Sequence, residues 1–230
     1  GLVGSEMCIR DSYKSGGEMF WDSGNTGSAT LNKNVTTYDA TIKHSGNYSA
    51  KLQSQYVALF GIGAFAAGNV FVGKFLKIDG TDGILRFGRP FTSRPSKLVL
   101  YYRYVAGTVD YSTLSELPKN SKDMGSIYIA LGDWPHQTFE GETDIPVLVK
   151  TKPADRQLFD SNSSNVIGYG ECILKESTEG EGLIKLEIPI NYRSNRKPTD
   201  IILVGSASRY GDYFTGSTGS TLWLDDLELI

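Results

Sequence analysis

Carboxylates beside aromatic rings are the main chemical resource of this sequence. Two acids can hydrolyse a glycosidic bond when they lie about 5–5.5 Å apart, for retention, or about 6.5–9.5 Å apart, for inversion. An aromatic ring next to an acid also suits sugar binding, because sugars present apolar C–H faces and a rim of hydroxyls. Among such combinations in the sequence, the candidates for this chemistry are Trp21–Asp22, Asp133–Trp134, Tyr169–Glu171 and Asp212–Tyr213.

The pattern favours sugar binding over catalysis. Arginines at 89 and 94 flank a short Pro-Phe-Thr-Ser segment, and their guanidinium groups could donate to hydroxyls or to a uronic carboxylate. Trp134 is predicted to be an exposed platform, because a proline and a polar loop follow it. The candidate ligand-binding residues are therefore Trp21, Asp22, Arg89, Arg94, Asp133, Trp134, Tyr169 and Glu171.

Two other roles stay open for these residues. In a glycoside hydrolase the acids would be catalytic, and Asp133 and Glu171 are the candidate pair. In a purely structural role the tryptophans would fill a core, and the acids would cap turns through backbone amides.

Two adjacent acids, Asp225 and Asp226, interrupt an apolar segment near the C-terminus. Leu222, Leu224 and Ile230 share the parity of Asp226, which predicts that this carboxylate faces the interior. A buried carboxylate needs partners. A structural calcium ion, with further ligands from the region around residues 22–25, or backbone amides would supply them.

Several other functions are disfavoured. The net charge of −3 comes with interspersed acids and bases, so no basic stripe exists for nucleic acid. The segment from Gly61 resembles a dinucleotide fingerprint, but glycines and alternating residues follow it where a helix would be needed. The two histidines, His44 and His136, lie at turns without a nucleophilic serine elbow or a paired cysteine. Two cysteines, Cys8 and Cys172, do not make a disulfide framework, and no apolar run reaches membrane-spanning length.

Period-2 alternation and glycine-rich turns predict the fold. Residues 97–105 and 183–190 alternate apolar and polar side chains, and Pro189 suggests an edge strand. Residues 126–131 and 200–205 are apolar on both faces, as central strands between two layers would be. With no linker or repeat, we expect one all-β domain over residues 18–230, a two-sheet antiparallel β-sandwich of jelly-roll type.

Several long segments resemble the putative carbohydrate metabolism domain (PCMD) family, whose members are exported proteins of glycan-degrading gut bacteria. The resemblance covers roughly residues 20–230 in the expected order. The segments that carry it are Phe20-Trp-Asp-Ser-Gly-Asn25, Ser45-Gly-Asn-Tyr-Ser-Ala-Lys-Leu52, Gly61-Ile-Gly-Ala-Phe-Ala-Ala-Gly-Asn69, Phe87-Gly-Arg-Pro-Phe-Thr-Ser-Arg-Pro95, Ile127-Tyr-Ile-Ala-Leu-Gly-Asp-Trp134, Tyr169-Gly-Glu171 and the C-terminal stretch from Ser206 to Ile230.

The resemblance implies a secreted or surface-anchored bacterial module that recognises an oligo- or polysaccharide without cleaving it. It also implies an additional N-terminal domain in the full-length protein. The alternatives are a glycoside hydrolase and a structural or adhesion module without a glycan ligand. Residues 1–12 look like translated sequencing-adapter read-through, so we expect residues 1–17 to be a disordered tail of artefactual origin.

Overall fold

The computed structural model describes residues 14–15, 18–29, 33–59 and 62–230. The expectation for residues 1–17 lies outside the described residues, except for Lys14–Ser15, and so does Cys8. Strand β1 (Lys14–Ser15) pairs with β2 (Glu18–Met19).

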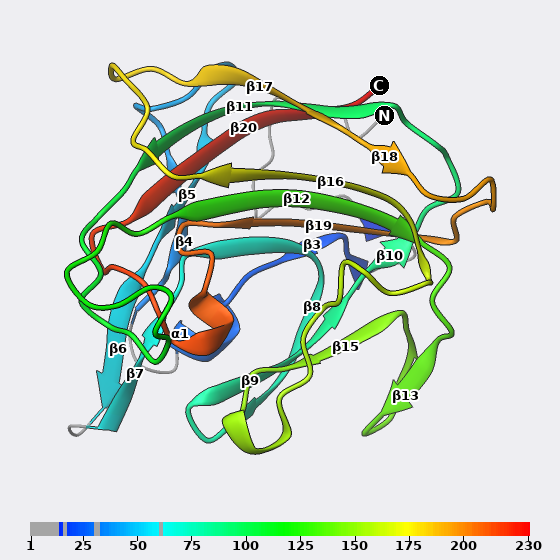
Figure 1. The fold of residues 1–230 in the computed structure, drawn as a ribbon, viewed down its shortest axis with the longest axis horizontal. Coiled ribbons are helices and arrows are strands. Elements are labelled where there is room, and N and C mark those ends of the chain that lie inside the picture. The colour runs from blue at the N-terminus through cyan, green and yellow to red at the C-terminus, as the bar shows by residue number, and fades with distance from the viewer. Residues whose placement is uncertain (1–13, 16–17, 30–32, 60–61) are drawn as a thin grey trace.

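The described chain is an antiparallel β-sandwich, as the alternation predicts. The smaller sheet has five strands in the order β17-β11-β20-β5-β4 (Figure 1). Their bounds are β4 (Thr36–Asp39), β5 (Ser49–Gln53), β11 (Lys97–Val105), β17 (Ile184–Pro189) and β20 (Thr221–Leu229).

The larger sheet has nine strands, with a main path β15-β9-β8-β19-β12-β16-β18. Two short strands lie off this path: β3 pairs with β8, and β10 pairs with β19. The bounds are β3 (Trp21–Asp22), β8 (Asn69–Asp79), β9 (Asp82–Phe87), β10 (Arg89–Pro90), β12 (Gly125–Gly132), β15 (Val147–Lys150), β16 (Val166–Leu174), β18 (Asn191–Tyr192) and β19 (Asp200–Ser206).

Two hairpins and three short helical segments complete the described part of the fold. The hairpins are β6 (Gln55–Leu59) with β7 (Ile62–Ala66), and β13 (Gln137–Phe139) with β14 (Glu142–Ile145). The helical segments are α1 (Asn25–Ser28), η2 (Pro153–Asp155) and η3 (Gly211–Tyr213). Among the described residues, no helix has the length and apolar character needed to cross a bilayer.

The main core fills the space between the two sheets. Strand β11 contributes Leu98, Leu100 and Tyr104, all fully buried, as its alternation predicts. Strand β17 is the edge of its sheet and ends at Pro189, which agrees with the missing backbone donor of proline. Strands β12 and β19 are neighbours inside the large sheet, so both expected central strands are confirmed.

The large sheet curves away from the sandwich on its other face. Figure 1 shows β9 and β15 turning below β12 and β19, with hairpin β6–β7 descending on the opposite side. A bulge between Phe75 and Lys77 interrupts the β8–β9 pairing. At Gly73 a Cβ would collide with the carbonyl of Arg86, so only glycine allows the two strands to approach this closely. The curvature leaves a concave surface that the small sheet does not cover.

Candidate functional site

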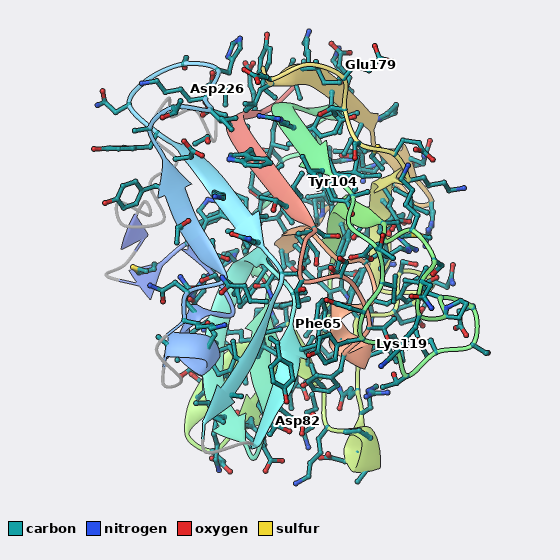
Figure 2. All side chains as sticks on the ribbon, turned by 90° about the vertical axis from the view of Figure 1, so that its left-hand side faces the viewer. Phe65, Asp82, Tyr104, Lys119, Glu179 and Asp226 are labelled. Carbon is teal, nitrogen blue, oxygen red and sulfur yellow. The ribbon has the colours of Figure 1, made fainter. Side chains whose placement is uncertain are left out.

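The concave face of the large sheet holds a hollow of about 470 Å³. Its lining is mostly apolar and comes from β7, β8, β9, β12, β19 and the segment that leads from β19 to β20. Figure 2 labels two of the lining residues, Phe65 and Asp82, which lie in the lower half of the molecule.

Strand alternation places the floor of this hollow. On β12, Ser126 and Tyr128 line the hollow, while Ile127 and Ile129 between and after them are fully buried in the core. The same alternation puts Ser206 of β19 on the hollow side. The sheet therefore has one apolar face for the sandwich core and one mixed face that can meet a ligand.

Three aromatic rings cluster around Tyr128, the ring of this group that lines the hollow. Tyr128 stacks on Phe159, with ring centroids 5.4 Å apart and planes at 7°. Tyr169, on the neighbouring strand β16, lies 6.1 Å from Tyr128, and the guanidinium of Arg193 lies 5.7 Å over its ring. Burial raises the pKa of Tyr169 to about 12, so its hydroxyl stays a hydrogen-bond donor at neutral pH.

A charged pair lies beside these rings. Glu171 is opposite Tyr128 in the β12–β16 register and forms an ion pair with Arg209, whose own residue lines the hollow. Both charged side chains are only partly exposed, at 21% and 27%. Arg209 follows β19 in the chain, so the pair connects this segment to β16. The ion pair holds the guanidinium of Arg209 and the carboxylate of Glu171 in place next to the stacked rings.

Asp212 is the third acid of this region, and it belongs to η3 in the same segment as Arg209. The turn closes through Phe214, which adopts a left-handed conformation with φ 53° and donates its amide to the carbonyl of Gly211. Asp212 lines the hollow and is exposed to solvent as a residue, while the protein packed around its carboxyl group displaces part of the bulk water there. This desolvation raises its pKa to about 6, against the opposing charge of Arg156.

The predicted tryptophan platform is wrong. Trp134 is only 7% exposed and packs in an apolar cluster, with its ring edge on Phe159 at 6.3 Å. A Cβ on Gly132 would lie 2.5 Å from the Trp134 ring, so glycine lets the indole fold back onto the strand. Trp21 is 6% exposed and belongs to the main core. Strand β12 already ends at Gly132, and the proline after Trp134 does not turn the indole outward.

Three other predicted binding residues hold the backbone together. Both carboxylate oxygens of Asp22 accept backbone amides, from Ser23 and Phe75, at 2.8 and 2.7 Å. Arg89 is buried and donates to the carbonyls of Met19 and Gly73 at 2.6 and 3.1 Å.

Arg94 also binds backbone carbonyls, in the loop that follows β18 at the edge of the large sheet. It donates to the carbonyls of Ser194 and Arg196 and lies 4.1 Å over the Tyr192 ring. None of these three lines the hollow.

The predicted catalytic pair of Asp133 and Glu171 does not form. Glu171 faces Tyr128, whereas Asp133 follows the last residue of β12 and pairs with Arg196, at 2.6 Å. The five positions between Tyr128 and Asp133 correspond to roughly 16 Å of strand, well beyond either hydrolase separation. Each acid instead has its own arginine.

The interior carboxylate of the last strand is Asp225, and the expectation for Asp226 is wrong. Asp226 has φ 47°, and the β11–β20 register gains one extra residue in β20 here. This bulge reverses the parity, so Leu227 returns to the core and Asp226 bonds His44 at 2.7 Å. Asp225, 1% exposed, accepts the backbone amides of His44 and Ser45.

Calcium ligands do not gather around Asp226. The carboxylate of Asp22, in the region predicted to supply further ligands, instead accepts amides from β8 and Ser23. Within the described ranges, no group of three or more histidine, cysteine, aspartate or glutamate side chains could hold a metal ion.

Of the residues singled out from the sequence, Asp212 lines the hollow, and Tyr169 and Glu171 lie next to it beside Tyr128. Sequence reasoning missed Tyr128, Phe159 and Arg209. The alternation of β12 could have found Tyr128, because it is the polar-tipped residue between inward-facing isoleucines. No local signal marks Phe159 or Arg209, since both reach the site from loops.

Comparison with known proteins gives the chain a family. The model of the putative carbohydrate metabolism domain matches residues 5–230. Among curated proteins, none matches the chain.

Two solved structures share the fold. A putative glycoside hydrolase from Bacteroides vulgatus ATCC 8482 is 24% identical with a TM-score of 0.66, over 95% of this chain and 89% of that one. A putative glycoside hydrolase from Bacteroides thetaiotaomicron VPI-5482 is 22% identical with a TM-score of 0.67, over 95% of this chain. This chain spans 65% of the length of the second structure. The family match over nearly the whole sequence means that the chain belongs to the putative carbohydrate metabolism domain family.

Proposed function

We propose that this domain binds a glycan in the concave hollow. The observation that carries the proposal is the cluster of Tyr128, Phe159 and Tyr169 next to the Glu171–Arg209 ion pair. The rings offer flat apolar surfaces for the C–H faces of a sugar, and the charged pair offers a donor and an acceptor for its hydroxyls. A hollow of about 470 Å³ has the size of a small-molecule site.

The carbohydrate-related family and the names of the two similar structures support this choice of ligand class. The domain would act within an exported carbohydrate-uptake or degradation system, secreted or anchored at the bacterial cell surface, with a further domain on its N-terminal side.

A glycan array tests the proposal directly. We expect the purified domain to bind one group of related oligosaccharides, and Tyr169→Ala to weaken that binding by about 1–3 kcal/mol. Tyr38→Ala is the matched control, because Tyr38 is 58% exposed on β4 and lies outside the hollow. Absence of binding to every glycan, or equal losses in the two variants, would overturn the proposal.

A further inference from the structure

The hollow has a polar end, which three neighbouring strands of the large sheet build. Ser126 of β12 lies opposite Ser206 of β19, and Ser206 lies opposite Asn69 of β8, so the three form one row on the floor of the hollow. Asn69 accepts the amide of Gly24, and the Ser206 hydroxyl donates to the carbonyl of Ser208. In the described part of the chain no group bonds the Ser126 hydroxyl. This end can therefore exchange hydrogen bonds with the hydroxyls of a sugar.

The floor becomes apolar from the next row onward. In that row Tyr128 lies opposite Val204, and Val204 lies opposite Phe71. Further along β8, Phe75 lies opposite Leu85 of β9. All five line the hollow, and Phe71, Leu85 and Val204 are at most 8% exposed. A sugar hydroxyl over the side chains of β8 and β9 would give up its hydrogen bonds to water and gain none in exchange.

A bulge extends this apolar stretch to the end of β8. The β8–β9 register skips Leu76, between Phe75 and Lys77. The bulge reverses the alternation, so Ile78 lines the hollow, whereas Lys77 binds Glu140 outside it. The apolar side of the hollow thus follows β8 along most of its length, on the course that Figure 1 shows from β19 down towards β9.

Glycines keep the apolar stretch narrow but open. The Phe75 ring lies between Gly27 of α1 and Gly83 of β9, where an added Cβ would come within 3.3 and 3.1 Å of the ring. Ile78, at the outer end, is 37% exposed, so this end opens to solvent. A stretch that is long, narrow and open at one end suits a flexible chain better than a compact ring.

We propose that the glycan bound in the hollow carries a linear hydrocarbon chain, which lies along β8 from Phe71 to Ile78. This inference rests on the proposed glycan binding and names the class of glycan. The sugar lies over Tyr128, within reach of the Ser126 hydroxyl, and the chain packs on the apolar side chains beyond it. Each methylene that leaves water favours binding, so affinity rises with chain length.

The test is a calorimetric titration with hexyl, octyl, decyl and dodecyl β-D-maltosides, each below its micelle concentration. We expect affinity to rise about two- to four-fold for each added methylene until the chain fills the stretch. Dodecanoate has the chain without the sugar, and phenyl β-D-maltoside has a ring in place of the chain. Both should bind more weakly than dodecyl maltoside. Affinity independent of chain length, or either of these two probes binding as tightly as dodecyl maltoside, would overturn the inference.

A variant at the outer end locates the chain. Ile78→Ser should weaken binding of dodecyl maltoside several-fold and leave hexyl maltoside unchanged, because only the longer chain reaches the end of β8. Ile184→Ser is the matched control, since Ile184 is also exposed, at 44%, but lies on β17 outside the hollow. Equal effects of Ile78→Ser on the two maltosides would place the chain elsewhere and overturn the inference.

The glycan array separates failure of this inference from failure of the proposed function. Binding of unsubstituted glycans on the array, without any gain from a hydrocarbon chain, would overturn the inference and leave glycan binding standing. Absence of binding both on the array and to every maltoside would count against glycan binding itself.

Discussion

Glu171 on β16 lies directly opposite Tyr128 on β12, and Arg209 binds Glu171 from the segment that follows β19. The pairing of β12 with β16 thereby places the Tyr128 ring beside the ion-paired carboxylate of Glu171. Cross-strand neighbours lie within about 5.5 Å, so the relationship is set by the sheet register rather than by a loop. A shift of this register by one residue would place Tyr128 and Glu171 on opposite faces.

Trp134 should behave as a core residue. Trp134→Ala removes a 7% exposed indole from its cluster, and we expect a loss of about 3–5 kcal/mol of unfolding free energy. Thermal melting should show a fall in Tm of roughly 10 °C. An unchanged Tm together with lost glycan binding would contradict this and restore the exposed platform.

Asp123 should be needed for stability. It is fully buried and accepts hydrogen bonds from Ser208, Ser217 and Ser220, each at 2.7–2.8 Å. Asp123→Ala leaves these donors unpaired, so we expect a loss of about 3 kcal/mol in chemical denaturation. Asp155→Ala, at an exposed turn, is the control and should cost little. Equal midpoints for the two variants would contradict the role of this buried network.

Asp212 should make stability depend on pH. Its pKa in the folded protein, about 6, lies above the ordinary value of 3.8, so the folded state binds this proton more tightly than the unfolded state. The stabilisation is complete below about pH 3.8 and is lost as the pH rises through about 6. Between pH 4 and pH 7.5 the Tm of the wild type should therefore fall relative to the Tm of Asp212→Asn, which lacks this titrating group. A constant difference between the two melts would show that Asp212 is not desolvated.

Stability should not respond to calcium through Asp225 and Asp226. The carboxylate of Asp225 accepts the amides of His44, Ser45 and Asp226, and Asp226 is bonded to His44. These partners occupy oxygens that an ion would need. Melts in calcium and in chelator should coincide, whereas a Tm that rises with added calcium would establish an ion that binds the folded state.

The fold could be predicted because alternation and turn chemistry act locally. Leu98 and Leu100 are buried and Pro189 lies on an edge, as their positions in the sequence indicate. The last strand shows where this reasoning stops. One extra residue at Asp226 reverses which residues of β20 face the core, and nothing in the composition of this segment predicts the bulge.

The site was only partly predictable, for a physical reason. Tyr169 and Glu171 are two positions apart on one strand, so they share a face and could be paired from sequence. Arg209 and Phe159 come from separate loops, and only the folded sheet brings them to Tyr128. The proline and polar loop after Trp134 predict a surface position, but the missing side chain of Gly132 leaves room for the indole to pack inward.

The most direct test of glycan binding in the hollow is a calorimetric titration with an oligosaccharide found on the array. Wild type, Tyr128→Ala, Tyr169→Ala and the control Tyr38→Ala are compared, with the fold of each checked by its melt. Both hollow variants should lose roughly 10-fold or more in affinity while the control binds like the wild type, because each lost aromatic contact costs about 1–3 kcal/mol. Unchanged affinity in both folded hollow variants would place the ligand elsewhere and contradict the account.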